Sequence, residues 1–242
     1  MLAHAIARGS LAGVVLAGLA LTASAQPTRH VDEANHFEAQ VLEGWYPIQE
    51  ALLDALTQQL QEETGNNQTR YVGGYSKSPA GEQTLPHVLF QVSDGDMNRL
   101  SEAGLIQVLN AKSLKRDASD TLSDVLTDLN LQVAWDPVER QIIIPLVAEA
   151  PGIGSVRGVF VGRVGSHGIV QINCYALASE FDATMPAFQE WIDGVQIDPN
   201  YEWKPGSEGG LDWRQVGWTG LIGGIASALG ALIYMRLRRS ET

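Results

Sequence analysis

The stretch "SVRGVFVGRVGSHGIVQINCYALASEFDATMPAFQEWIDGVQID" (155–198) decides the fold class of this chain. It begins with two runs of alternating apolar and polar residues, 155–164 and 169–176, on either side of the turn "GSHG" (165–168). A period of two is typical of a β-strand, and two such runs around a short glycine-containing turn predict a β-hairpin. The alternation also predicts one apolar face, which carries Cys174, and one more polar face.

A helical pattern follows the hairpin directly, over residues 179–194. Its apolar positions recur every three or four residues, as expected of a helix that buries one face. These positions are Phe181, Met185, Phe188, Trp191 and Ile192. Ser179 or Asp182 is expected to cap the helix start, and "VQI" (195–197) is predicted to return to the sheet.

The first half of the chain alternates in the same way between helical and strand patterns. Apolar residues recur every four positions within 44–63, with Trp45 beside the same stripe, which predicts a helix. Runs rich in β-branched and aromatic residues at 69–76 and 85–92 predict a strand pair.

Two more helices and one more hairpin are predicted before the opening stretch. The helices cover 97–110 and 119–129, and the hairpin joins 131–135 to 141–146. Antiparallel strands with helices before and after them predict an α+β fold, in which helices sandwich an antiparallel sheet.

The late hairpin, the helix with Pro186 and Phe188 inside it, and the short strand after Gly194 together resemble a known family segment. Residues 156–198 are similar to the closing part of the PsbP-like and Mog-type α/β/α sandwiches. The resemblance implies an accessory protein that binds a partner, such as a photosystem or a small GTPase, without catalytic residues. No partner-contact residue carries over, because the resemblance lies in the pattern and not in a diagnostic motif.

The N-terminal residues 1–25 read as a secretory signal peptide. An arginine precedes an apolar run, and Ala23, Ser24 and Ala25 supply small residues ahead of the predicted cleavage site. An uncleaved N-terminal anchor is the alternative. Residues 26–198 are then an extracytoplasmic domain, and the Pro- and Gly-rich residues 199–215 a linker.

Residues 216–235 are predicted to cross a membrane as a helix. They contain no Asp, Glu, Lys or Arg, and twenty helical residues span roughly the 30 Å of bilayer hydrocarbon. Aromatic and basic residues flank the segment, as expected at the two membrane interfaces. These predicted interface anchors are Trp213, Trp218, Tyr234, Arg236, Arg238 and Arg239. Residues 236–242 form a basic cytoplasmic tail, which places the domain outside a bacterial cytoplasmic membrane.

Two stripes of small residues lie on the predicted membrane helix. Small residues let helix backbones approach closely in lipid, so the stripes predict self-association of the helix. One stripe is Gly220, Gly224 and Ala228, and the other is Gly223, Ser227 and Ala231.

The segment between signal peptide and membrane helix is strongly acidic. Residues 26–215 contain 27 acidic and 12 basic residues, a formal charge of −15. Such a charge repels phosphate backbones and excludes nucleic acid as a partner. Basic partners and divalent cations fit it better, although acidity can also serve solubility alone.

The chain contains no local catalytic motif and no metal-binding motif. Cys174, its only cysteine, is predicted to be a buried apolar residue. His30 and His36 lie among acidic residues that suit zinc or copper, but their spacing is irregular and the segment is expected to be mobile. His87 and His167 have ordinary places at a strand start and in a turn. No catalytic residue, metal ligand or cofactor is predicted.

These features favour a membrane-anchored extracytoplasmic protein that binds or helps assemble another envelope component without catalysis. The alternative is an envelope hydrolase or metal-dependent enzyme whose site is assembled only in three dimensions. A deep pocket with converging His, Asp, Glu or Cys side chains would favour the enzyme, and a shallow surface would favour the binding protein.

Overall fold

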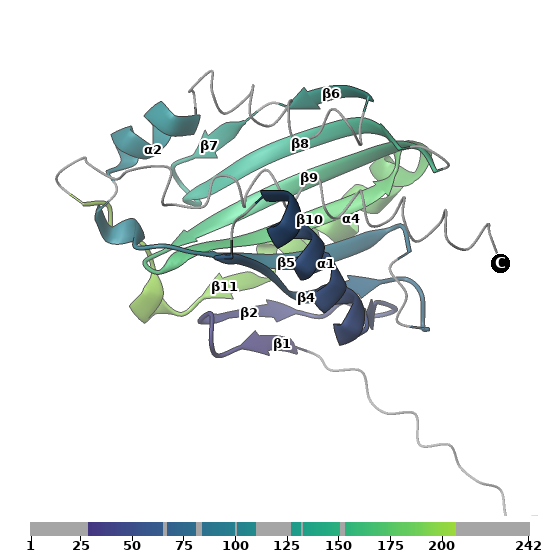
Figure 1. The fold of residues 1–242 in the computed structure, drawn as a ribbon, viewed down its shortest axis with the longest axis horizontal. Coiled ribbons are helices and arrows are strands. Elements are labelled where there is room, and N and C mark those ends of the chain that lie inside the picture. The colour runs from purple at the N-terminus through teal and green to yellow at the C-terminus, as the bar shows by residue number, and fades with distance from the viewer. Residues whose placement is uncertain are drawn as a thin grey trace, which may run out of the picture.

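The protein folds into three layers around a large antiparallel sheet (Figure 1). The computed structural model describes residues 29–64, 67–80, 84–99, 101–109, 127–131, 133–150 and 153–206. Helices lie on both faces of the sheet, so the predicted α+β sandwich is confirmed.

The large sheet has eight strands and runs in the order β3-β4-β5-β10-β9-β8-β6, with β7 paired to β8. The strands are β3 (Tyr46–Pro47), β4 (Thr69–Ser76), β5 (His87–Asp94), β6 (Thr127–Leu131), β7 (Ala134–Asp136), β8 (Gln141–Ala150), β9 (Gly154–Gly165) and β10 (Gly168–Leu177). Every neighbouring pair is antiparallel. The predicted hairpin of the opening stretch is β9 and β10, and the predicted strands 69–76 and 85–92 are β4 and β5.

One face of the large sheet is covered by α1 (Glu50–Thr64) and α2 (Glu102–Leu109), which follows the short 3-10 helix η1 (Met97–Arg99). The buried side chains of both helices share one core with the strands beneath them. That core includes Leu53, Leu56, Leu60, Leu89, Leu105, Ile142, Ile144, Phe160 and Tyr175.

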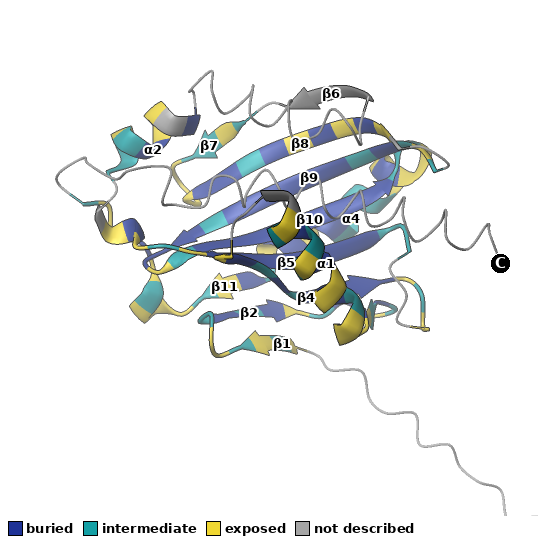
Figure 2. Cartoon of the chain, in the orientation of Figure 1, coloured by how far each residue is buried: buried dark blue, intermediate teal, exposed yellow. Residues whose placement is uncertain are grey.

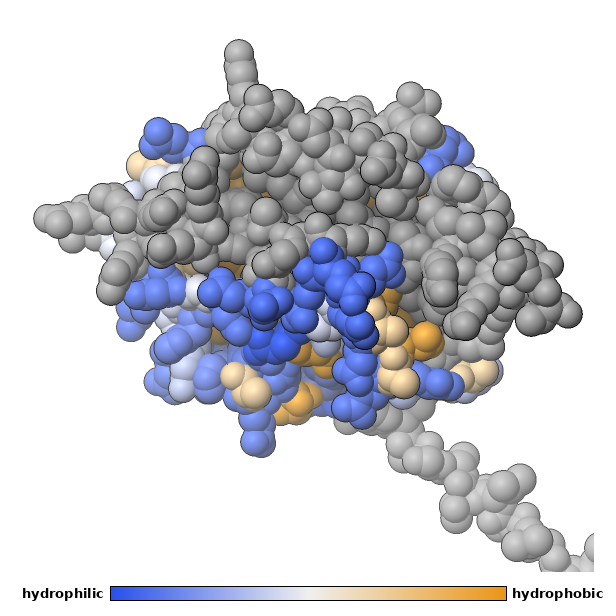
Figure 3. All heavy atoms as spheres, in the orientation of Figure 1, coloured by the Kyte–Doolittle hydropathy of each residue, from blue (hydrophilic) through white to orange (hydrophobic). Residues whose placement is uncertain are grey.

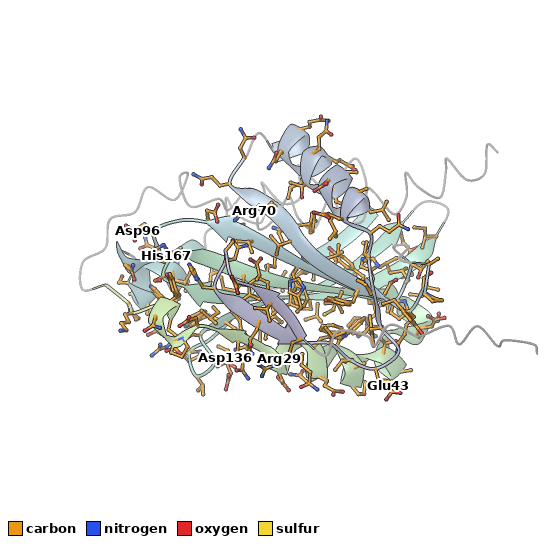
Figure 4. All side chains as sticks on the ribbon, turned by 90° about the horizontal axis from the view of Figure 1, so that it is seen from below. Arg29, Glu43, Arg70, Asp96, Asp136 and His167 are labelled. Carbon is orange, nitrogen blue, oxygen red and sulfur yellow. The ribbon has the colours of Figure 1, made fainter. Side chains whose placement is uncertain are left out.

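The other face is covered by α4 (Ala178–Asp193) together with a second sheet of three strands. This small sheet consists of β1 (Arg29–Asp32), β2 (Phe37–Gln40) and β11 (Val195–Ile197), in the order β1-β2-β11. Seen from below, it lies with α4 on the side of the large sheet away from α1 (Figure 4). Residues 195–197 therefore join a separate sheet, and the prediction that they return to the sheet of the preceding hairpin is wrong.

The small sheet corrects the prediction that the segment behind residue 25 is mobile. Phe37 and Ala39 of β2 and Val195 of β11 are buried against Phe90 and Ile172 of the large sheet. Four-residue strands carry too little local pattern to be recognised in sequence, and their apolar positions acquire a partner only through the tertiary fold.

Two predicted helix starts differ from the structure. The stretch 44–63 begins with β3, and α1 starts only at Glu50, because the residue before a proline avoids helical geometry and Pro47 follows Tyr46. Trp45 consequently belongs to the core on the α4 side. In α4 the N-cap is Leu177 without a side-chain bond, so neither Ser179 nor Asp182 caps the helix.

The predicted helix 97–110 is confirmed as α2 over its second half. Of the predicted helix 119–129, residues 119–126 lie outside the described residues, and Thr127 to Leu129 belong to strand β6, so the helix prediction is wrong there. These residues extend the edge of the sheet, where Thr127 pairs with Glu149 of β8.

The folded domain continues past residue 198 into the predicted linker. The 3-10 helix η2 (Pro199–Tyr201) follows β11, and Trp203 is buried in the core on the α1 side. The indole Nε1 of Trp203 donates a 2.8 Å hydrogen bond to the Met97 carbonyl. No helix among the described residues is long and apolar enough to cross a membrane, and residues 207–242 lie outside them.

Candidate functional site

The small sheet presents one face to solvent, and this outer face is the candidate site. Its strands alternate between buried and exposed positions, so every second side chain points outward. Val31 on β1 lies opposite Glu38 on β2, which in turn lies opposite Gln196 on β11. Arg29 and Gln40 form the next pair across β1 and β2.

Two adjoining hollows cover this outer face and share Glu38 and Gln196. The larger, of about 590 Å³, lies between the sheet and the C-terminal end of α4. The smaller, of about 420 Å³, lies between the sheet and the residues that lead into η2, and includes Val31, which is 59% exposed. Both are surface hollows and not enclosed cavities.

The charged residues that line the two hollows are mostly acidic. We call this surface the acidic face; it comprises Asp32, Glu33, Glu38, Glu190, Asp193 and Asp198, with the single arginine Arg29. Arg29 forms an exposed ion pair of 3.0 Å with Glu38, so its charge is already matched. The remaining carboxylates give the surface a strong negative potential.

The end of α4 adds to this potential. The C-terminus of a helix carries a partial negative charge, which basic residues in the last turn usually offset. The last turn of α4 contains no basic residue and instead carries Glu190 and Asp193. From the buried side, Arg163 of β9 donates a 3.0 Å hydrogen bond to the Ile192 carbonyl. The solvent side of this helix end has no basic residue from α4.

A third hollow, of about 340 Å³, lies between the β1–β2 turn and the β9–β10 turn. His36 stacks on Tyr201 with a ring-centroid distance of 3.3 Å, and His167 lies 5.2 Å from the same ring. Arg70 donates 2.6 Å hydrogen bonds to Asp94 and Asn35. Figure 4 shows His167 near Asp96, toward one end of the molecule. Because Arg70 forms an ion pair with Asp94, this third hollow, the inner hollow, lacks the excess negative charge of the acidic face.

The structure separates the two histidines that the sequence places among acidic residues. His30 lies in the interface between the two sheets, whereas His36 lies on Tyr201 in the inner hollow. His36 has a positive φ of 57°, in the left-handed region that few non-glycine residues adopt, because it lies in the tight β1–β2 turn. Among the described residues, no three His, Cys, Asp or Glu side chains gather to hold a metal ion.

The other candidate residues are also dispersed. Cys174 is fully buried in the core on the α4 side, as predicted, and burial raises the pKa of its thiol. His87 begins strand β5, as predicted, and its side chain is fully buried on the opposite face. The membrane-helix packing residues 220–231 and the interface anchors 213–239 lie outside the described residues.

Sequence reasoning missed the acidic face because its parts come from distant segments. Residues 29–40 supply two strands, and residues 186–199 supply the helix end, β11 and the following turn. The overall negative charge was the one available signal, and it does not say where the charges gather.

No family model matches the chain, and no curated protein matches it. Among solved structures, the chain is similar to the solution structure of cyanobacterial PsbP (CyanoP) from Synechocystis sp. PCC 6803. The TM-score is 0.45 with 11% sequence identity, and the match covers 78% of this chain and 98% of that chain. This weak similarity is to a PsbP protein, the kind of protein that residues 156–198 resemble, and it concerns the fold alone.

Proposed function

We propose that this protein is a non-catalytic binding protein of the bacterial envelope, and that a basic segment of a partner protein docks on its acidic face. The observation that carries the proposal is the lining of the two outer hollows, which combines six carboxylates with one arginine that is already paired. A lysine- or arginine-rich segment complements such a surface and is steered toward it by the field.

The shape of the acidic face supports a macromolecular partner. The two hollows adjoin across the width of the small sheet, and Val31 and Ile197 supply apolar atoms between the carboxylates. Interfaces combine an apolar centre with a charged rim in this way. On the α1 side, Figure 3 shows described residues that are mainly hydrophilic, with hydrophobic residues between them.

The floor of the acidic face is anchored firmly enough to present a fixed surface. Strands β2 and β11 place Phe37, Ala39 and Val195 in the core, and the backbone N–H of Gln40 donates a 3.3 Å hydrogen bond to the carbonyl of Gly194 at the end of α4. Folding has already ordered these groups, so a partner that binds this surface loses less conformational entropy on binding.

The test is photo-crosslinking in cells with a photoreactive residue at Gln196, in the middle of the acidic face. We expect an adduct with a protein whose crosslinked segment is rich in lysine or arginine. The triple variant Glu33→Gln, Glu190→Gln, Asp193→Asn should reduce its yield at least tenfold. The yield falls because the variant lacks three carboxylate charges that attract the basic segment of the partner.

A matched control removes the same charge from the opposite side of the molecule. Glu50→Gln, Asp54→Asn and Glu62→Gln change three exposed residues of α1 and leave the acidic face intact. This variant should keep the full adduct yield. Equal losses in both triple variants, or an adduct whose crosslinked segment is acidic or neutral, would refute docking on the acidic face.

The proposal includes a membrane tether through residues 216–235, with the domain on the periplasmic or outer side and a basic cytoplasmic tail. Its support is the uncharged length of this segment and its aromatic and arginine flanks. The mature protein should stay with membrane vesicles in alkaline carbonate and be cleaved by protease added to spheroplasts. Release by carbonate, or protection in intact spheroplasts, would contradict the tether.

A further inference from the structure

His30 of β1 inserts its ring between the small sheet and the large sheet. The imidazole stacks on Phe90 with a centroid distance of 5.1 Å and an interplanar angle of 21°. Phe37 and Tyr75 lie 5.6 Å and 6.0 Å away, so aromatic rings surround it on three sides. A Cβ at Gly73 would lie 2.5 Å from Cε1 of His30, which shows that the ring fills the space left by this glycine.

The two ring nitrogens of His30 have few hydrogen-bond partners. Nδ1 lies 3.3 Å from the hydroxyl of Tyr75, and Nε2 is buried without a hydrogen-bond partner among the described residues. A neutral imidazole has one N–H to satisfy, whereas the protonated ring has two. The Tyr75 oxygen can accept one of these, but the protonated ring would then bury a charged donor at Nε2.

The groups around His30 do not compensate for a positive charge. β2 and β5 present Phe37 and Phe90, and β4 presents Tyr75, which stays neutral because burial raises its pKa to about 12. Asp32, on β1 itself, is the carboxylate that acts on the ring. Burial lowers the pKa of His30, and the smaller effect of Asp32 raises it.

Strand β1 depends on this contact for its position. It has four residues, and its backbone pairs with β2 along one edge. Its alternate side chains Arg29 and Val31 face solvent, so His30 is the ring by which β1 packs on the large sheet. β1 contributes Arg29, Val31 and Asp32 to the acidic face, and the following turn places Glu33 there.

We propose that His30 is a pH-sensitive latch: the neutral ring holds β1 against the large sheet, and protonation releases β1 and dismantles one side of the acidic face. The release of β1 stands on the geometry of His30 alone. Its effect on partner binding rests on the function proposed above.

The direction of the response follows from the lowered pKa. Burial of His30 disfavours its charged form while β1 packs on the large sheet. Packing of β1 is therefore fully favourable above the ordinary histidine pKa of 6.5, and it weakens as the pH falls below that value. The ratio of packed to released β1 should fall by up to about tenfold for each pH unit below that value. The fall ends at the pKa that His30 has while β1 is packed on the large sheet.

Hydrogen–deuterium exchange of the full-length protein in detergent micelles tests the latch. Exchange of residues 29–40, corrected for intrinsic pH dependence, should accelerate by up to about tenfold between pH 6.5 and pH 5.5. The β9–β10 hairpin should not change over this range. His30→Phe, which keeps an aromatic ring that cannot be protonated, should abolish the acceleration.

Two further measurements keep the outcome clear. His167→Asn removes an exposed histidine from the β9–β10 turn and should leave the acceleration unchanged. A proton NMR titration of the wild-type protein reports the pKa of His30 directly, even where His30→Phe folds poorly. A His30 pKa at or above 6.5, or equal acceleration in the wild type and His30→Phe, would overturn the latch.

Binding of a synthetic lysine-rich peptide to the same samples separates this inference from the proposed function. Weaker binding at pH 5.5 in the wild type but not in His30→Phe supports both. Opening of residues 29–40 without any peptide binding at pH 7.5 refutes docking on the acidic face and leaves the latch standing. Peptide binding without opening refutes the latch alone.

Discussion

The central strands of the large sheet consist mainly of buried residues (Figure 2), but its two faces bury different kinds of side chain. On the α4 side, alternate residues of β5 and β10 are apolar, including Phe90, Ile172 and Cys174. On the α1 side, the intervening positions include polar side chains that are no more exposed. These are His87, Gln91, Gln171 and Asn173, each at most 1% exposed.

Three of the polar residues on the α1 side, Gln91, Gln171 and Asn173, are tolerated because they bond to one another. The Gln171 amide donates to the Asn173 side-chain oxygen, and the Asn173 amide donates a 3.3 Å hydrogen bond to Gln91. Buried polar groups usually have such partners, since leaving one unpaired costs about 1–3 kcal/mol. Alternation of apolar and polar residues in a strand therefore marks two faces, but it does not show that the polar face is exposed to water.

Loss of the Trp191 side chain tests the packing on the apolar face. Trp191 is fully buried in α4 and packs against Trp45, Tyr75 and Phe90. Trp191→Ala should reduce the free energy of unfolding by about 3–5 kcal/mol, because it removes these contacts and leaves a cavity. Urea unfolding measures the loss. Val138→Ala, at an 84% exposed position, should change it by less than about 0.5 kcal/mol; a loss that small for Trp191→Ala would contradict the packing described here.

A smaller effect is expected from the polar face. Asn173→Leu breaks the bonds to Gln91 and Gln171 and should cost about 2 kcal/mol of unfolding free energy. Replacing Gln91 and Gln171 by leucine in the same chain should recover most of this loss, because no amide of the hydrogen-bonded group then remains unpaired. If the triple variant is less stable than Asn173→Leu alone, the cost lies in packing and not in unpaired amides.

The smallest effect is a pH dependence specific to the α1 side. Burial lowers the pKa of His87 to about 3, against a weaker opposing effect of a backbone hydrogen bond with Thr84. The folded state thus disfavours the charged ring, so stability is complete above pH 6.5 and falls by about 1.4 kcal/mol per pH unit below it.

Unfolding of the wild type and His87→Phe between pH 7 and pH 5.5 measures this slope. The free energy of unfolding of His87→Phe should fall with pH less steeply than that of the wild type, by about 1.4 kcal/mol per pH unit. Identical slopes would show that His87 is hydrated or charged in the folded protein.

Elements with a strong local pattern could be predicted from the sequence. The β9–β10 hairpin, the β4–β5 pair and α4 each carry enough alternating or helical residues to be recognised without their partners. The start of α1 could have been placed better, since Pro47 already argues against a helix at Tyr46.

The acidic face could not be predicted, because β2 pairs with a strand more than 150 residues later. The partners of Phe37 and Ala39 exist only after that pairing. The place of His30 over Gly73 depends on the same long-range contact and has no local signature.

By itself the sequence determined the layered α+β class, the excess of negative charge and the uncharged segment near its end, because periodicity and composition are properties of the chain alone. Only the tertiary structure decided which polar residues are buried, where the carboxylates gather and which histidine is enclosed by aromatic rings. Burial and proximity are set by contacts between segments far apart in the chain, and no local pattern records them.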